Sequence, residues 1–370
     1  VKYPVFQPAV PAECDPATNV FETLARRDVL LHHPYDSFSP VLDFLRQAAE
    51  DPKVLAVKQT LYRTGPESPV VDQLVAAARA GKEVMVVIEL RARFDEQENI
   101  TLANRLQEAG VHVVYGVVGF KTHAKMILVV RRERAGLRNY VHVGTGNYHT
   151  KTARLYTDCG LLSANRSLGQ DVHSMFLQLT SLGRVSAMNR VMHAPFTLHS
   201  GLLERIARER DLADEGRKGR IVVRVNSLVE PEIIRALYQA SSAGVRIDLI
   251  VRGMCCLRPG VTGFSENIRV RSIIGRFLEH SRVYYFGNNG RPEVWLSSAD
   301  WMERSFFRRV ELATPVYDRR LRRRLMKELA WYLRDNTQAW LLRSDGRYER
   351  ASPGVNEDPF AVQQALLADA

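Results

Sequence analysis

Two segments of the sequence place a cation two residues after a histidine. His123 precedes Lys125 in the first segment, and His280 precedes Arg282 in the second. If each pair lies on a strand, the alternation of side chains puts both members on one face. A fixed cation opposes protonation of a nearby imidazole, so the ring can act as a nucleophile or base near neutral pH. The same cation can neutralise phosphoryl oxygens, so the pattern indicates phosphoryl transfer.

Each pair opens a longer block of similar design. The cation is followed by an apolar run, a polar turn and a small-polar segment, which ends at Asn147 in the first block and Asp300 in the second. His123 lies 24 residues before Asn147, and His280 lies 20 residues before Asp300. A single histidine of this kind is usually structural, but its recurrence predicts an internal repeat. A pseudo-dyad would bring both pairs to one cleft, where one histidine attacks phosphorus and the other handles the proton or leaving oxygen.

The elements around these blocks repeat as well. Near-continuous apolar runs are typical of buried strands in a sheet covered on both faces, and proline at the start and glycine at the end mark helices. The first copy predicts strands over 54–63, 83–90 and 111–115 with helices over 68–81 and 95–109. The second predicts strands over 221–225 and 245–251 with a helix over 231–244. We therefore expect an α/β fold of two tandem domains, each a mixed sheet flanked by helices.

Length and composition fit this organisation. The 370 residues are 45% hydrophobic and 25% charged, which is typical of a folded protein and excludes a disordered one. The expected division is a residual segment over 1–20, one domain over 21–190, a second over 191–350 and a mobile tail with a short helical end over 351–370. No apolar run approaches the roughly 18 residues that span a bilayer. The chain begins at Val1 with neither methionine nor a signal segment, which suggests a piece of a longer protein.

Cysteine usage and net charge limit the location and the partners. The four cysteines, Cys14, Cys159, Cys255 and Cys256, have neither metal-ligand spacing nor a disulfide pattern, so a reducing cytoplasm is expected. The formal net charge of +11 predicts a polyanionic partner: nucleic acid, an anionic membrane or polymeric phosphate. The arginine run over 319–324 alternates with leucines at helical spacing, which favours the solvated face of a surface helix.

Longer strings narrow the assignment. The histidine–lysine block followed by Gly144–Asn147 resembles the phospholipase D superfamily. That superfamily usually has aspartate five residues after the cation, whereas Val130 and Gly287 stand here, which argues against an ordinary lipase or nuclease. Between about Leu30 and Tyr332 the chain is similar to polyphosphate kinases of the histidine-phosphorylating type. The strings that carry this resemblance are 87–96, 144–148, 151–158, 249–255 and 296–302.

This resemblance implies reversible transfer of the ATP γ-phosphoryl group to inorganic polyphosphate through a phosphohistidine. His123 matches the phosphorylated nucleophile, with Lys125 beside it. His280, with Arg282, matches the second catalytic histidine, a proton donor to the leaving group and a contact to ATP. The two phospholipase D-like domains would then form a phosphotransferase whose substrates are ATP or ADP and polyphosphate.

Further site residues follow from the same resemblance. Tyr156 and Arg252 match nucleotide-binding positions, while Arg63 and Arg93 match positions associated with the Mg²⁺ cofactor. Arginine has only donors and cannot ligate a cation, so these two would clamp phosphate oxygens that Mg²⁺ also touches. Asn147 and Asp300 complete the two blocks. A basic channel for polyphosphate would draw on arginines of the set Arg131, Arg132, Arg308 and Arg309.

The resemblance also sets expectations for the whole protein. Family members have an N-terminal helical domain and a further domain ahead of this region, so the chain matches the C-terminal catalytic part and lacks some nucleotide contacts. Full-length members imply a cytoplasmic homo-oligomer without a nucleic-acid partner, and the basic charge allows peripheral membrane association. Two alternatives stay open: a phosphodiesterase acting on lipid or DNA, and a non-catalytic polyanion-binding fragment. The missing aspartates and the Arg63–Arg93 pair count against the diesterase.

Overall fold

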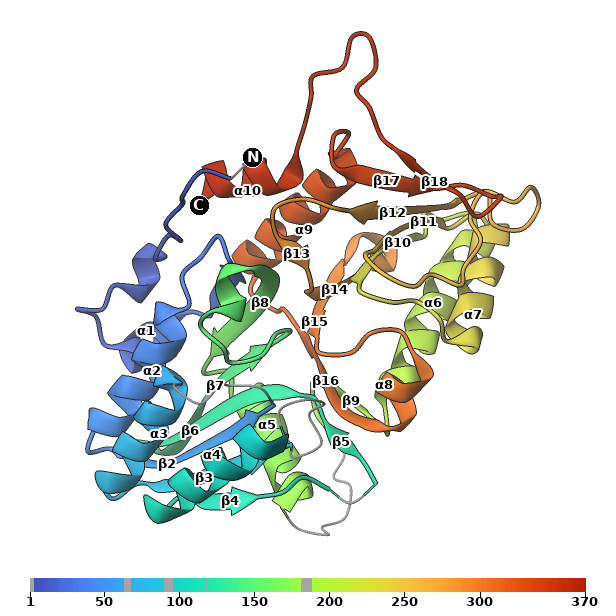
Figure 1. The fold of residues 1–370 in the computed structure, drawn as a ribbon. Helices are drawn as coiled ribbons and strands as arrows, with labels where there is room; N and C mark the ends of the chain where they lie inside the picture. The colour runs from blue at the N-terminus through green and yellow to red at the C-terminus, as the bar shows by residue number, and fades with distance from the viewer. Residues whose placement is uncertain (1–2, 63–67, 90–95, 118, 181–187) are drawn as a thin grey trace. The chain divides into compact units, whose positions relative to one another are not determined.

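The computed structural model describes residues 3–62, 68–89, 96–117, 119–180 and 188–370 (Figure 1). Contacts within the chain group it into two compact units. The N-terminal unit comprises Val5–Val191 together with Arg308–Leu312, and the C-terminal unit comprises Val1–Pro4, Met192–Phe307 and Ala313–Ala370. A short stretch of the second half of the sequence thus belongs to the N-terminal unit. Each unit is described by itself.

The N-terminal unit is built on a mixed sheet of order β1-β8-β7-β6-β2-β3-β4. Strands β2, β3 and β4 are parallel, and the remaining neighbours are antiparallel. The strands are β1 (Val29–His33), β2 (Val54–Leu61), β3 (Glu83–Ile88), β4 (His112–Val114), β6 (Lys125–Glu133), β7 (Gly136–Gly144) and β8 (Tyr156–Ser163), with the short β5 (Lys121–Thr122) apart from them. The helices are α1 (Val20–Arg26), α2 (Ser39–Glu50), α3 (Pro69–Arg79), α4 (Glu96–Glu108) and α5 (Arg166–Thr180).

The C-terminal unit repeats this topology. Its sheet has the order β16-β15-β14-β10-β11-β12-β17-β18, with β10, β11 and β12 parallel and the other neighbours antiparallel. The strands are β10 (Arg220–Val225), β11 (Arg246–Val251), β12 (Ile268–Ile273), β14 (Arg282–Phe286), β15 (Glu293–Ser297), β16 (Arg309–Pro315), β17 (Ala339–Leu342) and β18 (Tyr348–Arg350), with the short β9 (Met192–Ala194) and β13 (Leu278–Glu279). Of β16, only Ala313–Pro315 belongs to this unit. The helices are α6 (Leu198–Asp214), α7 (Pro231–Ser242), α8 (Glu303–Phe307), α9 (Arg319–Arg334) and α10 (Val362–Asp369). The order of β8, β7, β6, β2, β3 and β4 matches that of β16, β15, β14, β10, β11 and β12, so the predicted repeat is confirmed.

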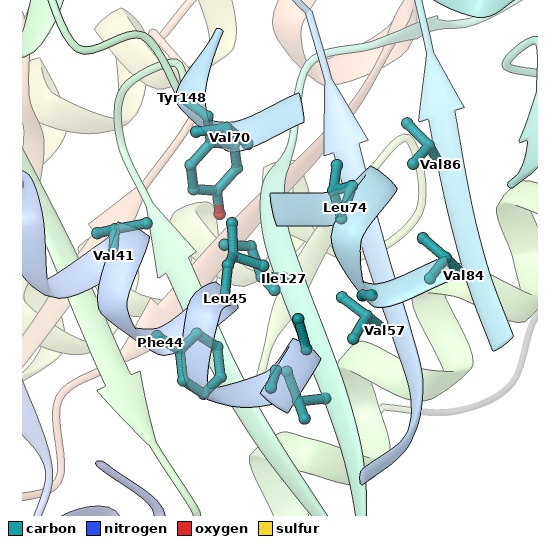
Figure 2. Close-up of a cluster of buried hydrophobic side chains, with 14 of the residues drawn as sticks. Val41, Phe44, Leu45, Val57, Val70, Leu74, Val84, Val86, Ile127 and Tyr148 are labelled. Carbon is teal, nitrogen blue, oxygen red and sulfur yellow. The ribbon is translucent and has the colours of Figure 1, made fainter. Parts of the chain in front are cut away.

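Burial of apolar helix faces holds each sheet in place. In the N-terminal unit, apolar side chains of α2 and α3 face the strands (Figure 2), because residues three and four apart in a helix share one side. They are Val41, Phe44 and Leu45 of α2 and Val70 and Leu74 of α3, packed with Val57, Val84, Val86 and Ile127 of the strands. The sequence signals for α3 hold, with Pro69 in its first turn and Gly81 just beyond its end at a φ of +79°.

The last part of the chain was predicted to form a tail with a short helical end over 351–370. The helical end is α10, which contacts α9 within the C-terminal unit. Val362 and Leu366 of this helix are buried, at 0% and 4% exposure. The prediction for α9 is confirmed: Leu321, Leu325 and Leu329 are buried, while its arginines lie on the outer side.

The cysteines and the helix lengths can be compared with what the sequence predicted. All four cysteines are free thiols, as predicted, and burial raises the pKa of Cys14 to about 12. In the described part of the chain, no helix combines the length and apolar character needed to cross a bilayer.

Candidate active site

His123 lies in a two-residue link between β5 and β6. We expected it to share a strand with Lys125, but β6 begins only at Lys125, since the backbone of residues 123 and 124 pairs elsewhere. The amides of His123 and Ala124 both donate to the carbonyl of Val310 at 2.9 Å. Lys125 is nevertheless close, because its buried ammonium donates to the carbonyl of His123. The predicted pair is therefore brought together by a backbone contact and not by strand alternation.

The imidazole of His123 is oriented by Glu311. Its Nδ1 lies 2.9 Å from Oε2 of Glu311, whose side chain is fully buried, and His123 itself is 9% exposed. A carboxylate only accepts hydrogen bonds, so Nδ1 carries the hydrogen and the lone pair of the neutral ring lies on Nε2. This is the arrangement that a nitrogen nucleophile requires. Both residues belong to the N-terminal unit, because Arg308–Leu312 is part of it.

Sequence reasoning missed Glu311, which lies 188 residues after its partner. The available signal was a charged residue within the apolar run Val310–Val316. Glu311 is buried within β16, so its carboxylate is not solvated by water. A buried charge of this kind requires a partner inside the protein.

The ring of His123 contacts Tyr62, and two lysines lie next to the Tyr62 ring. The rings of Tyr62 and His123 meet edge to face with centroids 5.4 Å apart. The ammonium groups of Lys121 and Lys125 lie 5.3 and 5.6 Å from the Tyr62 centroid. Two cations next to the tyrosine that contacts the imidazole favour the approach of an anionic phosphoryl group. Tyr62 and Lys121 were not predicted as site residues.

The Gly144–Asn147 segment is fixed by Asp158. The hydroxyl of Thr145 donates to the Asp158 carboxylate at 2.6 Å and accepts from the amide of Cys159 at 3.0 Å. Asn147 is half-buried, and its buried Oδ1 has no hydrogen-bond partner among the described residues. An amide oxygen in this condition suits a ligand that offers a donor.

Replacing Gly146 with alanine is expected to lower stability by about 1–3 kcal/mol. A Cβ there would lie 2.1 Å from Oδ2 of Asp158, so the Thr145–Asp158 contact would have to move. Denaturant unfolding measures the change. Gly354→Ala is the control, since its φ is not in the left-handed region and its Cβ position meets only side-chain atoms of Glu357, at 3.8 and 3.9 Å. Equal stability of Gly146→Ala and the unmodified protein would contradict the prediction.

The second block forms a separate charged cluster in the C-terminal unit. Arg282 binds Asp300 with two hydrogen bonds, Nε to Oδ1 at 3.2 Å and Nη2 to Oδ2 at 2.9 Å. Its Nη1 lies 3.2 Å from Nε2 and 3.4 Å from Nδ1 of His280, which is half-buried. Burial raises the pKa of Asp300, but Arg282 and the amide of Asn226 outweigh it and hold the pKa at about 2. Asp300 is thus a carboxylate that fixes Arg282 against His280.

Asn226 connects Arg252 to this cluster. Its amide N–H donates to Asp300 at 2.7 Å, its side-chain nitrogen donates to the carbonyl of His280 at 3.2 Å, and its side-chain oxygen accepts from Nε of Arg252 at 2.9 Å. Arg252 was predicted to bind nucleotide. In the structure it is connected to the backbone of His280 through a single residue, Asn226. Asn226 was not predicted as a site residue.

Of the other predicted site residues, Arg309 contacts the His123 cluster, with its Nη1 3.7 Å from Oε1 of Glu311. Tyr156 is half-buried at the start of β8, and Arg63 and Arg93 lie outside the described residues. Arg131 is paired with Asp51 and Glu133 and is 9% exposed, so it is a poor candidate for a polyphosphate channel. Arg132 and Arg308 are exposed. Whether the His123 and His280 clusters converge on one cleft stays a prediction.

Within the described ranges, one group of three residues has metal-ligand spacing, His199 with Glu230 and Glu232. Glu230 caps α7 by accepting from the amide of Ile233 at 2.7 Å, and Glu232 lies in the first turn, where the helix dipole favours negative charge. Helix capping accounts for these acids without a cation. The described residues therefore offer no protein cage for Mg²⁺ at either histidine.

Comparison with known proteins decides the family. Two family models match almost the whole chain: polyphosphate kinase C-terminal domain 1 over residues 19–185, and C-terminal domain 2 over residues 191–363. The chain belongs to the polyphosphate kinase family. A polyphosphate kinase from Pseudomonas aeruginosa strain PAO1 is 59% identical over 99% of the chain, and one from Xylella fastidiosa strain Temecula1 is 58% identical over the same share.

Solved structures agree with this assignment. The polyphosphate kinase of Porphyromonas gingivalis superposes on all of the chain with a TM-score of 0.92 at 35% identity. A phosphatidylserine synthase of Haemophilus influenzae matches 92% of the chain with a TM-score of 0.58 at 11% identity, which shows the fold alone. The predicted fold class is confirmed. The chain spans about half the length of the polyphosphate kinases it matches, 53% of the Pseudomonas protein and 56% of the Porphyromonas chain.

Proposed function

We propose that the protein of which this chain is the C-terminal region transfers the γ-phosphoryl group of ATP reversibly to inorganic polyphosphate. Membership of the polyphosphate kinase family supports this proposal. The observation that carries the mechanism is the 2.9 Å contact between His123 and the buried Glu311. It prepares one histidine of the chain as a nucleophile in surroundings that contain two lysines.

The reaction then proceeds in two transfers at His123. Nε2 attacks the γ-phosphorus, a nitrogen–phosphorus bond forms, and the bond from phosphorus to the ADP oxygen breaks. The ring hydrogen of the resulting phosphohistidine stays on Nδ1, which donates a hydrogen bond to Glu311. The carboxylate stabilises the positive charge that develops on the ring. A terminal oxygen of polyphosphate then attacks the same phosphorus, which breaks the nitrogen–phosphorus bond and lengthens the polymer.

His280 is proposed to bind the ADP part and to donate to its leaving oxygen. A guanidinium only donates hydrogen bonds, so a ring nitrogen of His280 that Arg282 contacts acts as the acceptor. The ring hydrogen then lies on the other nitrogen, which can donate to a phosphate oxygen. Arg252, held by Asn226, would supply a further cation for the nucleotide.

Mg²⁺ is proposed to enter with the nucleotide, held mainly by phosphate oxygens. This fits the described residues, which provide no acidic cage beside His123 or His280. Arg63 and Arg93 are proposed to clamp the same phosphates, and Tyr156 is proposed to contact the nucleotide. The net charge of +11 supports a polyphosphate partner. Homo-oligomer formation, a cytoplasmic location and peripheral membrane association stay predictions from the resemblance.

Labelling with γ-labelled ATP and Mg²⁺ tests the proposal, on both this chain and the full-length protein. We expect an acid-labile, base-stable label on the unmodified full-length protein and none on His123→Ala. His112→Ala is the matched control, because His112 is exposed on β4 and should keep the label. Equal labelling of His123→Ala and the unmodified protein would exclude His123 as the nucleophile. Release of alcohol or nucleotide from a diester without label would favour a phosphodiesterase, and neither activity in the full-length protein would leave polyanion binding.

A further inference from the structure

A glutamine of the last helix reaches the segment that carries His280. Gln363 lies in α10 and is 1% exposed, although glutamine is rarely buried in full. We propose that Gln363 is a positioning residue for His280. This inference rests on the proposed function of His280 and adds a residue that the repeat does not contain.

Gln363 binds the backbone just ahead of His280. Its side-chain oxygen accepts from the amide of Phe277 at 3.0 Å, and its side-chain nitrogen donates to the carbonyl of the same residue at 2.9 Å. One amide side chain therefore pairs with both polar groups of Phe277, much as a neighbouring strand would. Gly275 faces the same side chain, since a Cβ there would lie 2.5 Å from its oxygen.

The same glutamine also fixes Glu279, the residue next to His280. Its nitrogen donates to Oε1 of Glu279 at 2.7 Å. The other carboxylate oxygen is ion-paired with Arg224, whose guanidinium lies 4.0 Å from the centroid of the Tyr332 ring. Arg224 and Glu279 are each 3% exposed, so both charges need partners within the protein. Gln363 thus supplies one of the contacts that hold a buried carboxylate beside the catalytic candidate.

The start of α10 is itself anchored to the end of α9. Oδ2 of Asp335 accepts from the amide of Val362 at 2.7 Å, and Oδ1 of Asn336 accepts from the amide of Phe360 at 2.7 Å. This leaves Gln363 little freedom to follow a shift of residues 277–279. From the other side, Asn226 holds the carbonyl of His280. The backbone on both sides of His280 is therefore held in place, and α10 provides one of the supports.

The test compares Gln363→Met with Gln364→Met in the full-length protein. Methionine has about the length of glutamine but no amide, and Gln364 is the exposed neighbour in the same helix. We expect Gln363→Met to lower kcat for ATP-dependent synthesis about tenfold or more while Gln364→Met leaves it unchanged. We also expect faster amide hydrogen exchange over residues 274–281 in Gln363→Met alone. If this variant does not fold, Gln363→Asn, which keeps the amide one methylene short, takes its place.

A double-mutant cycle with His280→Ala separates positioning from a structural role. If Gln363 acts through His280, Gln363→Met should reduce kcat no further in the His280→Ala background. Additive losses would overturn the proposal, as would unchanged exchange over residues 274–281. Full activity of His280→Ala would instead refute the proposed function of His280 and remove the basis for this inference. The last result is distinct from the others, because it does not involve Gln363.

Discussion

Replacing Glu311 with alanine is expected to slow phosphorylation of His123 by about 100-fold. Oε2 of Glu311 accepts a hydrogen bond from Nδ1 of His123 over a distance of 2.9 Å. Removal of the carboxylate frees the ring to rotate and to take the other tautomer. The positive charge on the phosphorylated ring also loses its partner. Rapid-quench measurement of the labelled phosphoenzyme gives the rate. Because Glu311 does not face the nucleotide in this proposal, KM for ATP should change much less than kcat.

Two further variants sharpen the Glu311 prediction. Glu311→Gln keeps an oxygen that accepts from Nδ1 but removes the charge, so its rate should lie between those of Glu311→Ala and the unmodified protein. Glu22→Ala is the control for loss of an acidic residue from the same unit, since Glu22 is exposed. An unaltered rate in Glu311→Ala, with a normally folded protein, would show that His123 needs no partner at Nδ1.

Replacing Asp300 with alanine is expected to lower the free energy of unfolding by about 3–5 kcal/mol. The change leaves Arg282, which is 3% exposed, as a buried cation without its bidentate partner. It also removes the acceptor for the amide of Asn226. Denaturant unfolding measures the loss, and Asp345→Ala at an exposed position is the control. The Arg282→Met and Asp300→Ala double variant should recover part of the loss, because no unpaired charge then stays buried.

The contribution of Asp300 also has a defined pH dependence. Its pKa of about 2 in the folded protein lies below the ordinary value of 3.8, so the folded state favours the carboxylate. The stabilisation, about 2 kcal/mol, is fully present above pH 3.8 and is lost as the pH falls through 3.8 towards 2. The stability difference between Asp300→Ala and the unmodified protein should therefore shrink over that interval. A difference that stays constant from pH 5 to pH 2 would contradict the assignment of this pKa.

The sequence predicted the repeat because its signals are local. The apolar strands and the prolines and glycines that bound α3 and α7 can be recognised within a dozen residues, and the histidine–cation blocks recur at similar intervals. These features led to the mixed sheets and to His280, Arg282 and Asp300, which the structure brings into one cluster. Arg252, by contrast, was predicted only from the resemblance to polyphosphate kinases, and it follows directly after β11.

Contacts between residues far apart in the sequence could not be predicted from local patterns. Glu311 and Tyr62 approach His123 from segments that no sequence period connects to it, and the link between β5 and β6 replaced the continuous strand we expected. The contacts of α10 were missed for a similar reason: its start is anchored by the side chains of Asp335 and Asn336, which lie just beyond the end of α9. In each case the contact depends on the tertiary structure, and the spacing of residues along the chain does not predict it.

The membership of Arg308–Leu312 in the N-terminal unit has a consequence for how the gene can be divided. A fragment that stops near residue 190 keeps His123 but loses the carboxylate that orients it, together with the Val310 carbonyl on which its backbone rests. Separately expressed halves should then behave as a complementation pair, with the later half restoring labelling to the earlier one. A fragment meant to keep the His123 site intact must therefore carry that five-residue stretch along.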